Sequence, residues 1–227
     1  VTLTDNGTDS YSISYIQHRG YLYYIYDIGT GGEADIFYNN GSNSLYRISL
    51  DKVKGKECIA NMRRTGGKVI SFLHLQAAGS YVYYMIPDEN GMGEVYRFNI
   101  ETLKNEALNL GIIATENFVI WNGDVYYKKN WQETEVYIWH SQTGEEECFT
   151  DTKKSGYEKS SDFFVGTDYM YVTCFDGENL TGCNWLSVFD KSGEMVTELK
   201  LPVEMSVQYG GKDIFISYKG SDEEQYL

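Results

Sequence analysis

Tyr81-Val82-Tyr83-Tyr84-Met85 is the clearest copy of a phrase that this chain repeats five times. The other four copies are Tyr21-Leu22-Tyr23-Tyr24-Ile25, Asp124-Val125-Tyr126-Tyr127-Lys128, Tyr169-Met170-Tyr171-Val172-Thr173 and Asp213-Ile214-Phe215-Ile216-Ser217. Their second residues stand at positions 22, 82, 125, 170 and 214, so the later copies recur about every 44 residues. A period of this length is typical of a supersecondary unit that buries its apolar face against the next copy of itself.

Each repeat predicts four antiparallel strands, which we name A to D in chain order. Strand A is short and apolar, as in residues 118–121, and a glycine turn joins it to the tyrosine-rich strand B. A variable polar loop leads to strand C, as in residues 94–98, and a turn such as Gln142-Thr143-Gly144 leads to strand D. Short aromatic strands between glycine turns predict an all-β fold, and four of them per repeat predict the blade of a β-propeller.

The two ends of the chain predict how a ring of blades would close. The fifth repeat supplies strands A, B and the start of C, at residues 203–209, 213–218 and 224–227, but no strand D. Residues 2–5 match the close of strand D in the third repeat, residues 148–151. We therefore expect one domain over residues 1–227, a five-bladed propeller whose N-terminal strand completes the last blade; a truncated six-bladed propeller is the alternative. Residues 101–105 are compatible with a single helical turn.

The charge of the chain excludes two classes of partner. Its 227 residues contain 33 acids and 19 bases, for a net charge of −14. Nucleic acids and anionic membrane surfaces are bound through clustered Lys and Arg, so neither is expected as a partner. No run of 18 apolar residues predicts membrane insertion. Cationic partners and neutral ligands such as sugars remain compatible with this composition.

The four cysteines give no metal-binding pattern. Cys58 and Cys148 occupy matching places in non-adjacent repeats, which favours buried free thiols. Cys174 and Cys183 flank a loop and could form a disulfide across a hairpin. The three histidines, at positions 18, 74 and 140, lack the spacing of zinc ligands.

The sequence Val82-Tyr83-Tyr84, followed by a polar loop and Glu94-Val95-Tyr96-Arg97-Phe98-Asn99, resembles bacterial surface and periplasmic propellers. These are the relatives of the TolB propeller and of the Tyr-Trp-Thr-Asp propellers of lipoprotein receptors. The resemblance covers most of the chain in motifs about five residues long, although no repeat carries the full Tyr-Trp-Thr-Asp word. It implies an exported binding or scaffold module with an extracellular, cell-surface or periplasmic location.

The loops that join B to C, and D to the next A, are expected on one face of a propeller, where ligands usually bind. Glu116, Asp162 and Glu204 lie near the predicted starts of three A strands. Neighbouring carboxylates there could bind a cation such as calcium, or serve as acid and base in a glycoside hydrolase or lyase. Solvated loop residues are the simplest interpretation of all three.

Trp131 in the third B–C loop is the best candidate for a stacking platform, with packing between blades as the alternative. Tyr157, Arg63 and Asp88 are the other ligand-binding candidates on this face. Trp121, Trp139 and Trp185 lie within strands and are expected in the core. The sequence thus predicts a non-catalytic exported propeller that recognises a protein or a glycan without a cofactor, and the carboxylate enzyme or calcium site is the alternative.

Overall fold

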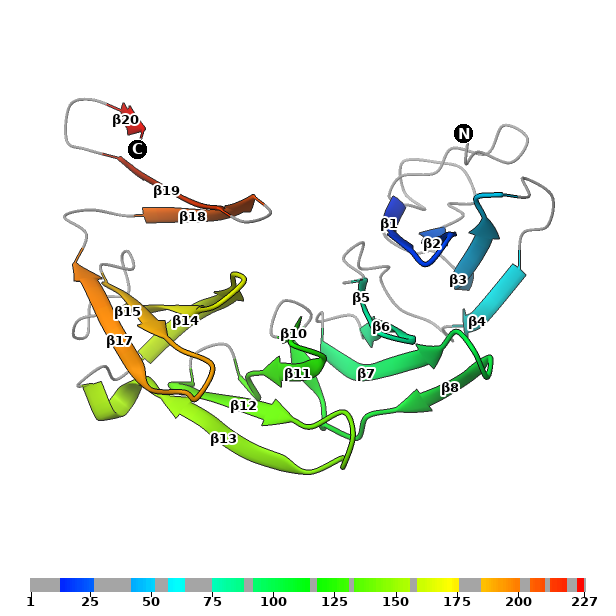
Figure 1. Cartoon of the computed structure of the whole chain (residues 1–227), viewed down its shortest axis with the longest axis horizontal. Coiled ribbons are helices and arrows are strands. Elements are labelled where there is room, and N and C mark those ends of the chain that lie inside the picture. The colour runs from blue at the N-terminus through cyan, green and yellow to red at the C-terminus, as the bar shows by residue number, and fades with distance from the viewer. Residues whose placement is uncertain are drawn as a thin grey trace. The chain divides into compact units, whose positions relative to one another are not determined.

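A computed structural model of the chain describes residues 13–26, 42–51, 57–63, 75–87, 92–114, 118–130, 133–155, 159–175, 185–200, 205–210, 213–219 and 224–226. The chain divides into two compact units, Val1–Thr115 and Glu116–Leu227, and each unit is described by itself. Nearly all of the regular structure in both units is β-strand (Figure 1).

Within its described residues, the first unit contains two sheets in which consecutive strands pair antiparallel. The first sheet has the order β1 (Ile13–His18), β2 (Tyr21–Tyr26), β3 (Ser42–Ser49) and β4 (Glu57–Arg63). The second has the order β5 (Gln76–Ala78), β6 (Tyr81–Pro87), β7 (Met92–Asn99) and β8 (Lys104–Ala107), and the short strand β9 (Ile113–Ala114) also pairs with β7.

The described part of the second unit contains three sheets of the same kind. The third sheet of the chain is β10 (Phe118–Trp121), β11 (Asp124–Tyr127), β12 (Glu135–Trp139) and β13 (Glu146–Asp151), followed by the 3₁₀ turn η2 (Thr152–Ser155). The fourth is β14 (Lys159–Val165), β15 (Met170–Phe175), β16 (Trp185–Phe189) and β17 (Met195–Lys200). The fifth has three strands, β18 (Met205–Gly210), β19 (Asp213–Lys219) and β20 (Glu224–Tyr226).

These sheets confirm the predicted all-β fold and the four-strand repeat. Four of the sheets carry strands A to D in sequence order, and the tyrosine-rich word is strand B in each. The fifth sheet carries the predicted strands A, B and C. Residues 2–5, the predicted closing strand, lie outside the described residues, so the five-bladed closed ring remains a prediction.

Burial is deepest in strand B and is least in the outer strand D. Val82, Tyr83, Tyr84 and Met85 of β6 are all buried, whereas Lys104–Glu106 of β8 are exposed. A strand that is buried on both faces needs apolar or aromatic residues at every position rather than at alternate ones. This requirement explains why the strand B words are continuous.

Two of the turns between strands A and B are two-residue hairpins with positive φ at both positions. They are Arg19-Gly20, with φ of 45° and 78°, and Asn122-Gly123, with φ of 53° and 92°. Asn-Gly suits such a turn, whereas arginine there costs roughly 1–2 kcal/mol. The Arg19 side chain offsets part of this cost, because it donates hydrogen bonds to Ser80 (3.2 Å) and Glu101 (3.0 Å) of the second sheet.

Aromatic and cationic side chains fill the contact between the first two sheets. Tyr23 and Leu45 of the first sheet share a core with Val82, Tyr84 and Phe98 of the second. The buried Arg47 guanidinium lies 4.7 Å from the ring centroid of Tyr21 and 5.7 Å from that of Phe98, and it forms an ion pair with Glu57 at 2.7 Å. In the second sheet, Arg97 repeats this arrangement, 4.3 Å from the Tyr81 centroid and paired with Glu106.

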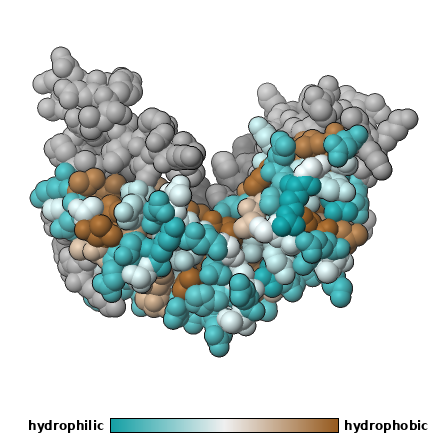
Figure 2. Space-filling view, in the orientation of Figure 1, coloured by the Kyte–Doolittle hydropathy of each residue, from teal (hydrophilic) through white to brown (hydrophobic). Residues whose placement is uncertain are grey.

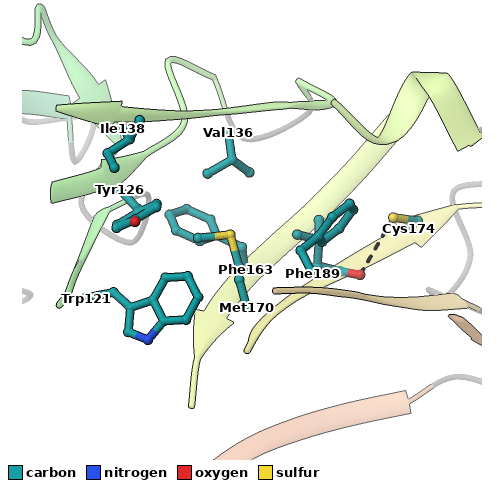
Figure 3. Close-up of a cluster of buried hydrophobic side chains, with 9 residues drawn as sticks. Trp121, Tyr126, Val136, Ile138, Phe163, Met170, Cys174 and Phe189 are labelled. Atoms are coloured by element: carbon teal, nitrogen blue, oxygen red, sulfur yellow. Dashed lines mark hydrogen bonds between the residues drawn. The ribbon is translucent and has the colours of Figure 1, made fainter. Parts of the chain in front are cut away.

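The contact between the third and fourth sheets is apolar. Figure 3 shows Tyr126, Val136 and Ile138 of the third sheet facing Phe163, Met170 and Phe189 of the fourth. Trp121 completes the cluster, with its ring edge-on to Tyr126 at 5.3 Å between centroids. Trp121 and Trp139 are buried and Trp185 is partly buried, so the expectation of core tryptophans is confirmed.

The backbones of the third and fourth sheets also approach closely at one point. Gly193, in the turn between β16 and β17, has a φ of 82°, and a Cβ atom at this position would overlap the carbonyl oxygen of Phe149 in β13. Gly144 occupies the matching turn of the third sheet with a φ of 74°, but a Cβ there would only touch Trp139 at 4.0 Å. Glycine is therefore required at position 193 both by the positive φ and by the close approach of the Phe149 carbonyl. At position 144 it is required by the positive φ alone.

Two sequence predictions are wrong in local detail, and a third is not tested. Residues 101–105 do not form a helix, because Lys104 and Asn105 belong to β8. The loop before β8 is closed by the amide of Leu103, which donates to the Asn99 carbonyl, and by the Asn99 side chain, which accepts hydrogen bonds from the amides of Glu101 and Thr102 (all 2.9 Å). Cys58 and Cys148 are exposed rather than buried, since they lie on outer D strands. The Cys174 side chain is buried, and Cys183 lies outside the described residues, so a disulfide between the two remains a prediction.

Candidate ligand-binding face

In the second unit, the described bases of two loops meet at one end of the third and fourth sheets. The B–C loop of the third sheet runs from the end of β11 to the start of β12, and the following D–A loop runs from η2 to β14. In an antiparallel order these two connections emerge at the same end of their sheets. This end is the face on which the sequence predicts ligand binding.

Lys128 links the bases of these two loops from inside the protein. The whole residue is buried, and its Nζ donates hydrogen bonds to the Oγ of Ser160 at 2.8 Å and to the Ser160 carbonyl at 3.2 Å. Ser160 is buried too, and its hydroxyl donates to the Glu133 carbonyl at 2.5 Å. Because a buried ammonium group is costly without hydrogen bonds, this Lys128–Ser160–Glu133 link holds the two loop bases at a fixed separation.

Each loop base has further hydrogen bonds of its own. The Glu133 amide donates to the Asn130 carbonyl at 3.2 Å, and the Asn130 side chain donates to the Glu133 carboxylate at 2.7 Å. The amide of Thr152 and its hydroxyl both donate to the Thr134 carbonyl, at 3.0 and 3.3 Å. These bonds fix the described base of the B–C loop and the start of the D–A loop.

The neighbouring cation Lys129 is engaged within the third sheet. Its Nζ lies 3.9 Å from the ring centroid of Tyr137 and 2.8 Å from the Glu146 carboxylate. Burial alone would raise the pKa of Glu146, but the hydrogen bonds from Lys129 and Tyr127 outweigh it and lower that pKa. Tyr137 donates to Glu135 at 2.7 Å, and this bond together with burial raises the pKa of the phenol. These side chains therefore stabilise the sheet.

Cys174 lies in the core next to this end of the fourth sheet. Its thiol is 3.6 Å from the hydroxyl of Ser187 and donates to the Val172 carbonyl at 3.6 Å. Burial raises the pKa of the Cys174 thiol, which keeps it protonated. A buried protonated thiol is a poor nucleophile, so the geometry gives Cys174 a packing role.

The predicted site residues fall mostly outside the described part of the chain. Trp131, Tyr157, Asp88, Glu116 and Glu204 are not among the described residues, and Arg63 is described only as the last residue of β4. The structure therefore does not test whether these side chains come together.

Asp162 is the one predicted carboxylate that the structure describes. It is an exposed residue of β14, at a register shift between Ser160 and Phe163. Its amide donates to the Thr173 hydroxyl, which in turn donates to the Asp162 carbonyl, each at 3.0 Å. These bonds involve the main chain of Asp162 and leave its carboxylate on the surface.

Two features are missing from the part of the chain that the structure describes. In this part of the chain no three His, Cys, Asp or Glu side chains gather as metal ligands would. The same residues include no helix with the length and apolar character needed to cross a bilayer.

The Lys128–Ser160–Glu133 link is a feature that sequence reasoning missed. Lysine at the end of a strand is usually solvated, and Ser160 is 32 residues away in the chain. The available signal was the position of Lys128 directly after the buried word Val125-Tyr126-Tyr127.

Comparison with known proteins identifies the fold. No family model matches the sequence, and no curated protein matches it. The β-propeller domain of the Trilobed protease from Pyrococcus furiosus, described as having an open velcro topology, aligns over 98% of this chain and 72% of its own at 12% identity, with a TM-score of 0.53. TolB from Acinetobacter baumannii aligns over 95% of this chain at 10% identity with a TM-score of 0.50.

Acylaminoacyl peptidase from Pyrococcus horikoshii aligns over 93% of this chain at 13% identity, with a TM-score of 0.54. This chain spans about half of the TolB chain and about a third of the peptidase, at 52% and 36%. At these identities the likeness establishes the β-propeller fold and leaves the function open.

Proposed function

We propose that this chain is a non-catalytic, exported binding propeller that recognises a protein or a glycan on the face formed by its B–C and D–A loops. The observation that carries the proposal is the buried Lys128–Ser160–Glu133 link, which fixes two loop bases at that end of the second unit. Binding surfaces are commonly built from variable loops on a rigid support, because ordering the support beforehand lowers the entropic cost of binding.

The ligand-contacting residues in this proposal are Trp131, Tyr157, Arg63 and Asp88. Trp131 belongs to the two-residue segment between Asn130 and Glu133, whose hydrogen bonds close the loop. Tyr157 belongs to the segment just before β14, where Ser160 bonds to the Glu133 carbonyl. An aromatic ring in each of two loops with joined bases would suit a sugar ring or an apolar peptide side chain.

The proposed architecture is a five-bladed ring in which residues 2–5 pair with the fifth sheet as its strand D. The fifth sheet has three described strands, A to C, whereas each of the other four sheets carries strands A to D, and this difference supports the arrangement. Closure by a shared strand protects the sheet edges that an open array would expose. A disulfide cross-link between cysteines placed at Thr4 and Gln225, in a variant with Cys58 and Cys148 replaced by Ser, would trap this pairing.

Binding can be tested by screening the protein on a glycan array and against a displayed peptide library in parallel. We expect selective ligands whose affinity falls by about tenfold or more in Trp131→Ala, since a buried aromatic anchor contributes more than about 1.4 kcal/mol. Tyr169→Ala is the matched control, because Tyr169 is an exposed aromatic in an A–B turn at the opposite end of the fourth sheet. Ligands that respond to Tyr169→Ala but not to Trp131→Ala, or two empty screens, would refute the proposal.

A further inference from the structure

Asn122 and Gly123 form the one Asn-Gly pair among the described residues. They make the two-residue turn between β10 and β11, with φ of 53° and 92°, and both residues are exposed. A Cβ atom built on Gly123 would meet nothing within 4 Å, so no neighbouring atom in the described part of the chain hinders approach to this glycine. An asparagine side chain is most open to attack by the next backbone nitrogen when the next residue is glycine, because glycine has no Cβ to block the attack.

Deamidation of such a pair needs only the chain and water. The backbone nitrogen of Gly123 attacks Cγ of Asn122, a C–N bond forms, and the side-chain NH2 leaves as ammonia with the proton of the Gly123 amide. Water then opens the five-membered succinimide at one of its two carbonyl carbons, which gives either aspartate or isoaspartate, whose main chain is longer by one CH2 group. Water reaches the exposed turn directly, and Figure 2 shows a mainly hydrophilic surface over the described residues on the visible face.

The conformation of the turn controls this reaction. Positive φ at both positions is typical of the type I′ hairpin turn, in which the ψ of the first residue is about +30°. At that ψ the side chain of Asn122 and the nitrogen of Gly123 lie on opposite sides of the Cα–C bond of Asn122, whereas ring closure needs them on the same side. The turn must therefore open before the succinimide forms, and the rate of deamidation follows the fraction of molecules in which it is open.

Contacts on both sides of the turn keep it closed. Trp121, which precedes the turn, is buried and lies edge-on to Tyr126, with 5.3 Å between the ring centroids. Ser141 donates from its hydroxyl to the Gly123 carbonyl at 2.6 Å and from its amide to the Asp124 carboxylate at 2.8 Å. Since the turn has only two residues, the longer main chain of an isoaspartate would prevent these contacts from all forming again.

We propose that Asn122 is a site of spontaneous deamidation, that opening of the turn between β10 and β11 sets the rate of the reaction, and that the isoaspartate formed there keeps the turn from closing again. The modification is then an irreversible switch that loosens the third sheet as the protein ages. This turn lies at the end of β11 opposite to the B–C loop, so the proposal is independent of the loop face assigned above to ligand binding.

Peptide mapping by mass spectrometry, on the full chain stored at mildly alkaline pH either folded or unfolded in urea, tests this proposal. We expect deamidation at Asn122 in both samples, at least about tenfold slower in the folded chain because the turn is closed most of the time. Ser141→Ala should speed the reaction about twofold to tenfold in the folded chain alone, since it removes the hydrogen bond to the Gly123 carbonyl. A folded chain that reacts as fast as the unfolded one, that shows no product at Asn122, or that does not respond to Ser141→Ala would overturn the proposal.

The matched control for the effect on stability is Asn122→Gly, which has no side-chain amide at this position and still suits the turn. It keeps the other Asn-Gly pairs of the chain, which begin at Asn6, Asn40 and Asn90, so ageing at those pairs affects it and the parent alike. We expect the melting temperature, followed by circular dichroism, to fall further in the stored parent than in stored Asn122→Gly. Fresh Asn122→Asp should melt close to the fresh parent, because aspartate tolerates a positive φ. A stored parent that melts no lower than the stored control would overturn the proposed loosening.

Discussion

The first two sheets and the third and fourth sheets have the same strand order but different side chains at one equivalent position. This position lies on strand C, opposite the third residue of the strand B word. It holds Arg47, Arg97, Ile138 and Val188 in the four sheets. The repeat therefore accepts either a stacked cation or an aliphatic side chain at one place in its core.

The two solutions satisfy the same physical requirement. In the first unit, the flat guanidinium of Arg47 lies against Tyr21 and Phe98 and reaches Glu57 at the edge of the sheet. In the second unit, Ile138 joins a layer in which Tyr126 and Trp121 meet edge-on. Both side chains fill this layer of the core, and neither leaves a charge unpaired. The comparison indicates that the packed volume of the side chain at this position matters more than whether the side chain is cationic or aliphatic.

The largest expected effect is at the backbone contact between the third and fourth sheets. Gly193→Ala combines a left-handed φ with an overlap on the Phe149 carbonyl, so we expect the free energy of unfolding to fall by about 3 kcal/mol or more. Gly144→Ala has the left-handed φ alone and should lose about 1 kcal/mol. Urea unfolding of both variants measures the difference, and equal losses would contradict the contact.

Exchanging the two kinds of core residue tests the comparison directly. Ile138→Arg should lose about 3 kcal/mol, because the guanidinium would have to displace the packed aromatic layer. Arg47→Met should lose only about 1 kcal/mol, because methionine preserves much of the packed volume and the abandoned Glu57 is half exposed. A loss for Arg47→Met as large as that for Ile138→Arg would show that the cation is essential to the first unit.

A smaller effect is expected from the histidines of the two units. Hydrogen bonding to Glu147 (3.2 Å), with a second contact to Asp124 (3.4 Å), raises the pKa of His140. The resulting stabilisation is fully present below the unfolded-state pKa of about 6.5 and is lost as the pH rises through the higher folded-state value. Because the side chain is 34% exposed, the contribution should stay below about 1 kcal/mol.

Urea unfolding between about pH 5.5 and 8 measures this contribution. His140→Gln should flatten the pH dependence of stability in that range. His18→Gln is the matched control in the first unit, since His18 Nε2 donates to the Gly79 carbonyl at 2.8 Å rather than to a carboxylate. A pH dependence that persists in His140→Gln but disappears in His18→Gln would reverse the assignment.

The repeat words of the sequence were sufficient to predict the strands, because strand B is buried on both faces and must be apolar or aromatic throughout. The role of Arg47 could not be predicted, since its stacking partners Tyr21 and Phe98 come from two strands distant in sequence. Cys58 and Cys148 were matched correctly between repeats, opposite Tyr46 and Tyr137, but their exposure depends on strand D being outermost.

The candidate ligand face was harder to predict than the fold. The loops could be located from their polar composition, but Lys128 and Ser160 carry no sequence signal that distinguishes a buried link from two solvated residues. The pattern of residues along the sequence shows where a strand is. A hydrogen bond between two sheets depends instead on how those sheets pack against each other, which the pattern does not show.

The proposed closure of the repeated sheets into a ring with one loop face can be measured in solution. Small-angle X-ray scattering, extrapolated to infinite dilution so that only the monomer contributes, tests it most directly. A closed, compact chain of 227 residues should have a radius of gyration of about 17 Å. A value several ångströms larger would contradict closure, because blades in an open row spread their mass further from the centre.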